Sequence, residues 1–159
     1  MTDSHNELGL KRKDTKDLAL KLNELLANYH VYYQNLRAFH WNIKGGNFFA
    51  LHAKFEELYT AAFETIDEIA ERILTLRHVP MHSFSDYLAN STVQERKNLS
   101  SDKETVGATV ENIGQIIHLE REVLALAAEL DDEGTQGLIS DDLNTLEKNL
   151  WMLNSFQAS

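Results

Sequence analysis

Residues 39–72 read FHWNIKGGNFFALHAKFEELYTAAFETIDEIAER, and this segment decides how the rest of the chain is interpreted. Two apolar-periodic stretches meet in it at the pair Gly45-Gly46. Its polar side chains include five possible metal ligands, which are His40, His52, Glu56, Asp67 and Glu71. The first question is whether these five residues can form one site or are only ordinary polar residues on the faces of helices.

Upstream of the two glycines, apolar residues recur at steps of four and three, which predicts a long amphipathic helix. Asp14 or Thr15 can cap its start, and Asp17 adds negative charge to its first turn. Gly45-Gly46 is typical of a helix end. The apolar stripe consists of Leu18, Leu22, Leu25, Tyr29, Tyr32, Leu36, Phe39 and Ile43.

A second long helix is predicted downstream, with Asn47 as its cap. Because about two residues separate the two helices, they must pack antiparallel. The second apolar stripe consists of Phe48, Leu51, Phe55, Leu58, Ala62, Ile66, Ile69, Ile73 and Leu76.

The remaining chain contains two more long helices and a long connection. Residues 78–100 break the helical pattern around Pro80, with one short helix expected near Phe84–Leu88. The run Ser101–Glu104 is a capping box that starts the third long helix. The run Asp131–Gly134 is a tight acidic turn, and the last helix is expected from about Thr135.

Short, long and short connections predict an all-α fold, a ferritin-like four-helix bundle with one long crossover that carries a short extra helix. The second and third long helices can then run parallel. We expect residues 14–159 to form this single domain and residues 1–13 to be a short flexible tail.

The composition excludes several classes of protein. The chain has 159 residues, no cysteine and a net charge of −10. Thiol catalysis, iron–sulfur clusters and disulfides are therefore excluded. The negative charge disfavours non-specific binding to nucleic acid and favours attraction of cations. Neither a signal peptide nor an apolar run of membrane-spanning length is found, so we expect a cytoplasmic protein without a membrane partner.

Spacing alone places the five candidate ligands in two groups. No histidine follows a glutamate by three residues, so the usual di-iron centre inside one bundle is not expected. His52 with Glu56, and Asp67 with Glu71, are i,i+4 pairs that each project from one helix face. His52 and Asp67 lie about 22 Å apart along a helix, too far to bind one ion.

A second copy of the chain removes this difficulty. If two such helices cross antiparallel about a two-fold axis near Ala61-Ala62, the first pair of one chain meets the second pair of the other. His40 can fold back and complete the first pair. The alternative is that these are ordinary polar residues on solvated faces. Lone histidines such as His30 and His118 are interpreted as surface or core residues.

Three runs carry a resemblance to a known family: residues 40–45 (HWNIKG), 49–56 (FALHAKFE) and 66–72 (IDEIAER). They resemble the Dps mini-ferritins, and the likeness extends over the whole chain in helix order and length. The resemblance implies a hollow homododecamer that oxidises iron(II), preferentially with hydrogen peroxide, and stores the iron(III) mineral, protecting against oxidative stress. A ferroxidase with iron as its metal is the function it implies.

The family's inter-subunit ligands fall on the five candidate residues already quoted, with Asp67 and Glu71 supplied by the neighbouring subunit. Glu56 is a departure, because the family commonly has Asp there. The longer side chain keeps the chemistry but can shift or weaken one iron position. Trp41 resembles the family's aromatic residue next to the site, which can supply an electron. Simple packing is the other interpretation of Trp41.

In ferritin-like shells iron enters through acidic pores, and the turn Asp131, Asp132 and Glu133 is the pore candidate, followed by Asp141-Asp142. A plain solvated turn is the alternative. The second functional hypothesis is a nucleoid DNA-binding protein with secondary iron chemistry. Only Lys11-Arg12-Lys13 could serve as a basic arm, so DNA binding is not expected. A third hypothesis is a purely structural four-helix dimer without metal.

Overall fold

The computed structural model describes residues 5–10 and 15–158 and contains five helices. Four of them are long and form the bundle, and the remaining one, α3, is a short helix in the crossover. Their bounds are α1 Thr15–Asn42, α2 Phe48–Thr75, α3 Phe84–Asn90, α4 Asp102–Glu129 and α5 Glu133–Gln157. The prediction of an all-α, ferritin-like bundle with a short extra helix is confirmed.

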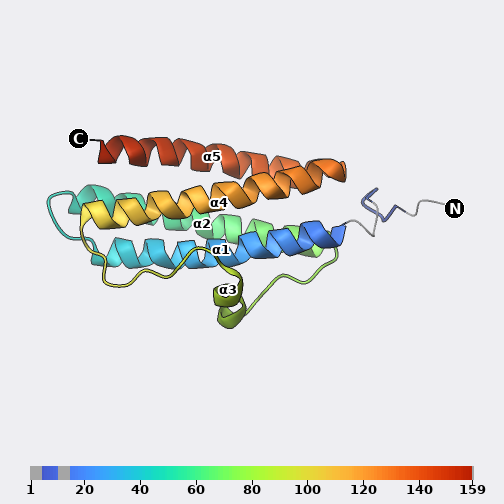
Figure 1. The fold of residues 1–159 in the computed structure, drawn as a ribbon, viewed down its shortest axis with the longest axis horizontal. Coiled ribbons are helices and arrows are strands. Elements are labelled where there is room, and N and C mark those ends of the chain that lie inside the picture. Colours follow the sequence, from blue (N-terminus) through green and yellow to red (C-terminus); the bar gives the residue numbers. More distant parts are fainter. Residues whose placement is uncertain (1–4, 11–14, 159) are drawn as a thin grey trace.

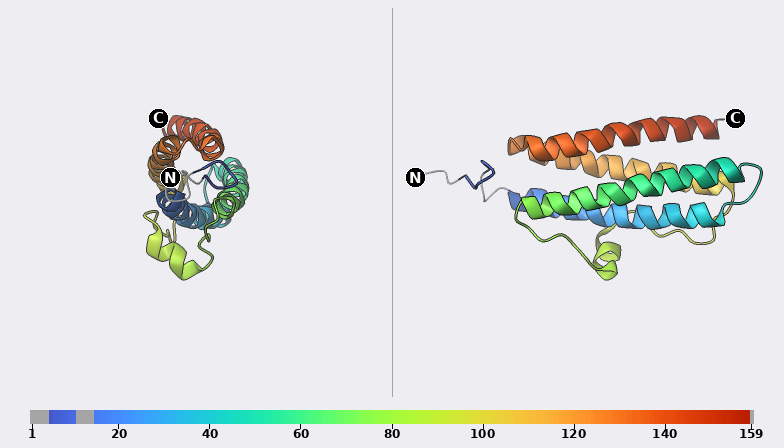
Figure 2. Two further views of the ribbon diagram at one scale, coloured as in Figure 1. Left: turned by 90° about the vertical axis from the view of Figure 1, so that its right-hand side faces the viewer. Right: turned by 180° about the vertical axis from the view of Figure 1, so that it is seen from behind.

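Figure 1 shows α1 and α2 side by side and antiparallel, with α4 and α5 forming the other pair. The crossover from α2 passes α3 and returns along the bundle, so α4 starts at the same end as α2 and runs parallel to it. Figure 2 shows this connection, with α3, on one side of the bundle. The long crossover is therefore what sets the relative direction of the two helix pairs.

The link between α1 and α2 is longer than the glycine pair alone predicted. Helix α1 ends at Asn42, and residues 43–47 make the turn. Gly45 has a φ of 113°, a conformation that residues with a side chain rarely adopt. Asn47 precedes α2, but its side chain does not cap that helix. It donates instead to Asp102 Oδ2 of α4, and so ties the two helix starts together.

The starts of the last two helices are capped by side chains. The capping box at Ser101 and Glu104 is present as predicted. Helix α5 begins at Glu133, two residues before the expected start, because Asp132 accepts a hydrogen bond from Thr135 N. Asp131 has a φ of 55° and makes the reversal between α4 and α5.

The apolar stripes of the four long helices meet in one core. Its largest fully buried side chains include Tyr29 and Tyr32 of α1, Phe39 near the end of α1, and Phe55 of α2. No helix in the described ranges has an apolar run long enough to cross a bilayer.

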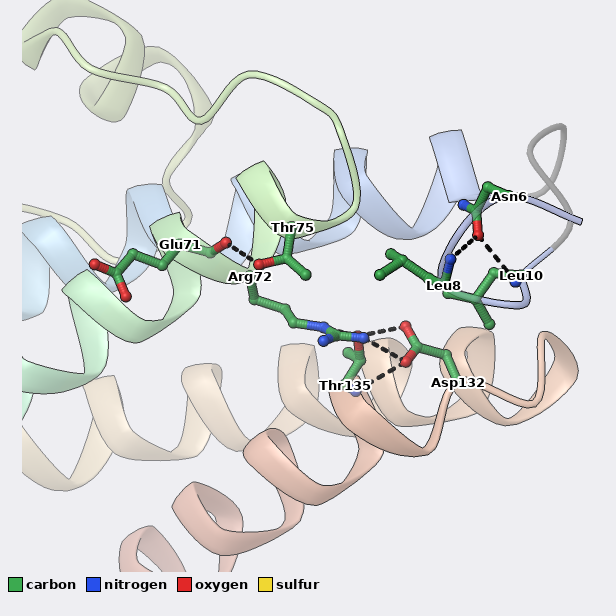
Figure 3. Close-up of polar contacts among 8 residues, drawn as sticks. All are labelled: Asn6, Leu8, Leu10, Glu71, Arg72, Thr75, Asp132 and Thr135. Atoms are coloured by element: carbon green, nitrogen blue, oxygen red, sulfur yellow. Dashed lines mark hydrogen bonds and ion pairs between the residues drawn. The ribbon is translucent and has the colours of Figure 1, made fainter.

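Part of the predicted tail has a defined turn. Asn6 Oδ1 accepts hydrogen bonds from Leu8 N and Leu10 N, as Figure 3 shows, and Leu10 joins the core. Residues 11–14 lie outside the described residues, and with them the basic run Lys11-Arg12-Lys13 and the possible cap Asp14.

Candidate metal centre

The end of α1 and the start of α2 bring two histidine side chains into contact. His40 and His52 are stacked, with ring centroids 3.8 Å apart and an interplanar angle of 13°. His40 is buried and His52 is half-buried. The antiparallel packing of the helices produces this contact, as the short link predicted, although the two residues are twelve positions apart in sequence.

The two histidines are held by reciprocal hydrogen bonds. His40 Nδ1 lies 2.7 Å from the carbonyl oxygen of His52, and His52 Nδ1 lies 2.7 Å from the carbonyl oxygen of His40. Since a carbonyl oxygen only accepts, each Nδ1 must carry the proton and donate it. In the neutral form of each ring, the lone pair is then on Nε2. Fixing the tautomer of a ligand histidine through its second nitrogen is a recurrent feature of metal sites.

The three carboxylates of the candidate set lie on the exposed side of α2. Glu56 lies one turn after His52, and Asp67 and Glu71 follow nearer the end of the helix. All three are exposed. The side chains thus form two groups on one helix, His52 with Glu56 and Asp67 with Glu71, separated along the helix axis by about 22 Å between their first members.

Within one chain these two groups do not converge. No group of three or more His, Cys, Asp or Glu side chains in the described residues is placed to hold a metal ion. His40 joins His52 as predicted, but Asp67 and Glu71 stay apart from them. The observed geometry is therefore two separate groups of candidate ligands, His40 and His52 with Glu56, and Asp67 with Glu71.

Asp67 borders a large apolar groove between α1, α2 and α3. Its cavity volume is about 470 Å³. Aromatic rings line much of it, including Phe63 of α2 and Phe84 and Tyr87 of α3. Phe63 and Phe84 are among the exposed large apolar side chains of the chain. An exposed apolar groove of this kind is typical of a surface that binds another protein or a ligand.

The midpoint of α2 differs in one respect from the expectation that two such helices cross near Ala61-Ala62. Ala62 is buried in the core of its own chain, so it cannot lie on an interface between two α2 helices. Ala61 and Thr60 are exposed there, and Phe63 follows them. An approach of two helices at this point would therefore use Thr60, Ala61 and Phe63 rather than the alanine pair.

Trp41 is not packed inside its own chain. Its side chain is 57% exposed, and the Arg37 guanidinium carbon lies 4.8 Å from the centroid of its ring. Arg37 also contacts the ring of Tyr33 at 5.4 Å. A cation–π contact with Arg37 thus holds the indole in place in the last turn of α1, next to His40. Packing within one chain does not account for Trp41.

The acidic turn between α4 and α5 has divided roles. Asp132 is buried, and its carboxylate accepts hydrogen bonds from Thr135 and from the guanidinium of Arg72 at 2.6 Å. Figure 3 shows Arg72 reaching from α2 to this turn, with the carboxylate of its neighbour Glu71 pointing elsewhere. Asp132 therefore joins α2 to α5. Of the pore candidates at this turn, only Asp131 and Glu133 remain exposed.

The secondary pore candidate Asp142 faces the bundle interior. It accepts hydrogen bonds from the hydroxyl groups of Tyr29 and Thr65. Glu120 of α4 lies against it, fully buried. Burial, the largest cause, and the neighbouring Asp142 together raise the pKa of Glu120 to about 11. Asp142 is therefore unsuited to line a pore, whereas Asp141 stays exposed.

Sequence reasoning missed Glu120, although a signal was present. Counting three residues on from Ile117 places Glu120 on the apolar stripe of α4, between Ile117 and Val123. A charged residue at such a position predicts a buried polar contact. It also missed Phe48 and Tyr59, whose rings contact the two histidines. Neither ring could be distinguished from ordinary core residues by its spacing.

Comparison with known proteins connects this geometry to a described family. The family model for the ferritin-like domain matches residues 19–158. The DNA protection during starvation protein of Porphyromonas gingivalis is 39% identical over 93% of this chain and 93% of its own length.

Two solved structures show the same arrangement of helices. The DPS protein of Vibrio cholerae O1, described as a member of a broad superfamily of ferritin-like diiron-carboxylate proteins, has a TM-score of 0.93 and 47% identity over 96% of each chain. The Dps protein of Bacillus brevis has a TM-score of 0.88 and 36% identity, and the match covers 91% of this chain and 97% of that one.

Proposed function

Because the chain belongs to the Dps family of ferritin-like proteins, whose role is iron storage and protection, we propose that it is a ferroxidase. It oxidises iron(II) at sites shared between two subunits, preferentially with hydrogen peroxide. The iron(III) mineral is stored inside a hollow homododecamer. The reciprocal hydrogen bonds between His40 and His52, which leave both Nε2 lone pairs free, are the observation that carries the proposal.

In this proposal each site combines the two half-sites of different chains. His40, His52 and Glu56 come from one subunit, and Asp67 and Glu71 come from its neighbour across a two-fold axis. Imidazole and carboxylate ligands without thiolate suit iron(II), and they also accept zinc or manganese. Two copies related by a two-fold axis give two equal sites.

The stacked rings support two adjacent iron positions. Each imidazole can offer one Nε2 to an ion, and the two ring centroids lie 3.8 Å apart, so two ions can be bound close together. Two iron(II) ions supply the two electrons that hydrogen peroxide needs. With two protons, the peroxide is reduced to two water molecules, and two iron(III) ions remain. Because the O–O bond receives both electrons, no hydroxyl radical is released.

The aromatic groove beside Asp67 supports the same assembly. A second copy placed with its α2 antiparallel to the first would cover exposed Phe63 and bring its own His52 and Glu56 toward Asp67 and Glu71. Burial of apolar rings then supplies the driving force for the contact. Asp131 and Glu133 are proposed as pore residues, with Asp132 as the cap that shapes the turn. Trp41 is proposed as an electron donor beside the site.

A mixed-subunit experiment tests the shared site. His52→Ala and Asp67→Ala each remove one half-site from every centre, so each variant alone should lose rapid peroxide-driven iron oxidation. When the two variants are co-expressed, half of the random dimers contain one chain of each kind. One of the two centres in such a dimer carries only native ligands, which restores about a quarter of the wild-type rate.

Glu64→Ala is the matched control, because Glu64 is an exposed acid of α2 outside the ligand set. It should keep the wild-type rate, alone or mixed. Recovery requires that the ligands come from different chains. If the co-expressed mixture stays as inactive as the two separate variants, while the mixture and both variants assemble, the proposal of a shared centre is wrong. If wild-type protein oxidises iron no faster than buffer, the ferroxidase itself is wrong.

A further inference from the structure

Two further aromatic rings extend the stack of the candidate ligand histidines. Phe48 lies parallel to His52, with ring centroids 5.0 Å apart and an interplanar angle of 18°. Tyr59 meets His40 edge-on, with centroids 5.3 Å apart at 81°. The order Phe48, His52, His40, Tyr59 forms a four-ring column, so each histidine has an aromatic neighbour besides the other histidine.

The hydrogen bonds and the column restrict different motions of the imidazoles. A single bond from Nδ1 to a carbonyl oxygen fixes one atom of each ring and its tautomer. It still allows the ring to tilt about that atom, because the torsion that turns an imidazole is broad. An aromatic ring packed against the face or the edge of the imidazole prevents this tilt. Together the two kinds of contact fix the direction in which each Nε2 points.

His52 depends on this packing more than His40. His40 is buried, whereas His52 is half-buried. One face of the His52 ring lies against His40, and Phe48, the first residue of α2, stacks on the ring as well. Without Phe48 the His52 ring gains room to rotate, and metal binding must then order it at the expense of affinity.

We propose that Phe48 and Tyr59 are positioning residues for metal binding: they act through His52 and His40 by holding both imidazoles in the ligating orientation before an ion arrives. The inference rests on the proposed metal centre and adds two residues that do not touch the metal. Phe48 has the larger effect, because the ring it supports is the more exposed one.

Cobalt(II) affinity, followed by its d–d absorption on the assembled wild-type protein, gives a readout that is independent of iron oxidation. Phe48→Leu keeps an apolar side chain but removes the stacked ring, and it should bind cobalt(II) about 10-fold more weakly. Phe48→Tyr restores a ring and should recover wild-type affinity. Tyr59→Leu should weaken binding by a smaller factor, whereas Tyr59→Phe should not.

Phe49→Leu is the matched control, since Phe49 is the adjacent ring and contacts Phe48 but neither histidine in the stack. Its cobalt(II) affinity should stay at the wild-type value. Thermal stability and subunit number are measured for all variants, because a purely structural role lowers stability without a ring-dependent change in affinity. Should Phe48→Leu fail to assemble, the Tyr59 pair supplies the same comparison.

The two proposals fail in different ways. If wild-type protein binds no cobalt(II), or if His52→Ala binds it as tightly as wild type, the metal centre itself is wrong. If wild type binds and His52→Ala does not, yet the leucine variants of both ring positions match wild type, only the positioning role is overturned. A loss in Phe48→Leu that Phe48→Tyr does not reverse also overturns it.

Discussion

Replacing Glu120 by glutamine should make the protein more stable at neutral and alkaline pH. Glu120 is fully buried in α4, and neither of its carboxyl oxygens accepts a hydrogen bond. Its neighbour Asp142 accepts hydrogen bonds from the hydroxyl groups of Tyr29 and Thr65. A protonated Glu120 can donate a hydrogen bond to Asp142.

The groups around Glu120 explain why it stays protonated. Asp142 and Glu147 both disfavour a second negative charge there. Tyr29 and Tyr32 of α1 stay neutral, because burial raises the pKa of each. Among the described residues, no Lys, Arg or His forms an ion pair with Glu120. Because no cationic partner is found there in the described part of the chain, this carboxyl group is neutralised by a proton.

The magnitude follows from the two pKa values of Glu120. The carboxyl group ionises near 4.5 in the unfolded chain, whereas its pKa in the folded chain is about 11. Folding between these values takes up a proton, so the contribution of Glu120 to stability is greatest below pH 4.5 and is lost as pH rises toward 11. At about 1.4 kcal/mol per pH unit, the loss between pH 5 and pH 8 is about 4 kcal/mol.

Glu120→Gln keeps the shape and the donor to Asp142 but needs no proton. Urea unfolding at pH 5 and pH 8 measures the effect. With a slope of about 2 kcal/mol per molar urea, the variant's midpoint should gain about 2 M relative to wild type between the two pH values. Glu129→Gln, an exposed acid of the same helix, is the control and should follow wild type. Parallel pH profiles for Glu120→Gln and wild type would refute the reasoning.

Two further predictions concern the Arg72 contact and DNA. A Cβ at Gly134 would lie 2.7 Å from Arg72 Nη2, so Gly134→Ala should break the Arg72–Asp132 ion pair and lower the free energy of unfolding by about 1–2 kcal/mol. Gly137→Ala, in the same helix with open space around it, should instead raise stability by up to about 1 kcal/mol, and equal urea midpoints for the two variants would contradict this. Because the net charge is −10, a gel-shift assay with duplex DNA at about 0.15 M salt should show no complex, and a clear shift would favour the nucleoid hypothesis.

Much of the fold was predictable because helix periodicity and capping are local properties. The capping box at Ser101 and Glu104 needs only four neighbouring residues, and the structure confirms it. The ends of helices were harder to predict. Asn47 looked like a cap, but its side chain binds Asp102, more than fifty residues away. The start of α5 depends on Asp132, whose carboxylate also binds Arg72, 60 residues away in sequence.

For the proposed metal centre, the sequence by itself determined the types of candidate ligand and their grouping. The i,i+4 spacings on α2 and the rise per residue already required two half-sites, because a helix is rigid over that length. The sequence also paired His40 with His52, since a short link forces antiparallel packing. These conclusions depend on distances along one or two helices, and periodicity supplies such distances.

Only the tertiary structure decided how the side chains are oriented and which acids are buried. The reciprocal carbonyl contacts of His40 and His52, the flanking Phe48 ring and the buried Glu120–Asp142 pair all arise where different helices meet. Sequence spacing specifies the face of a helix on which a residue lies. Sequence spacing does not specify which atom of the next helix lies against that residue, and this atom sets the tautomer, the ring plane and the pKa.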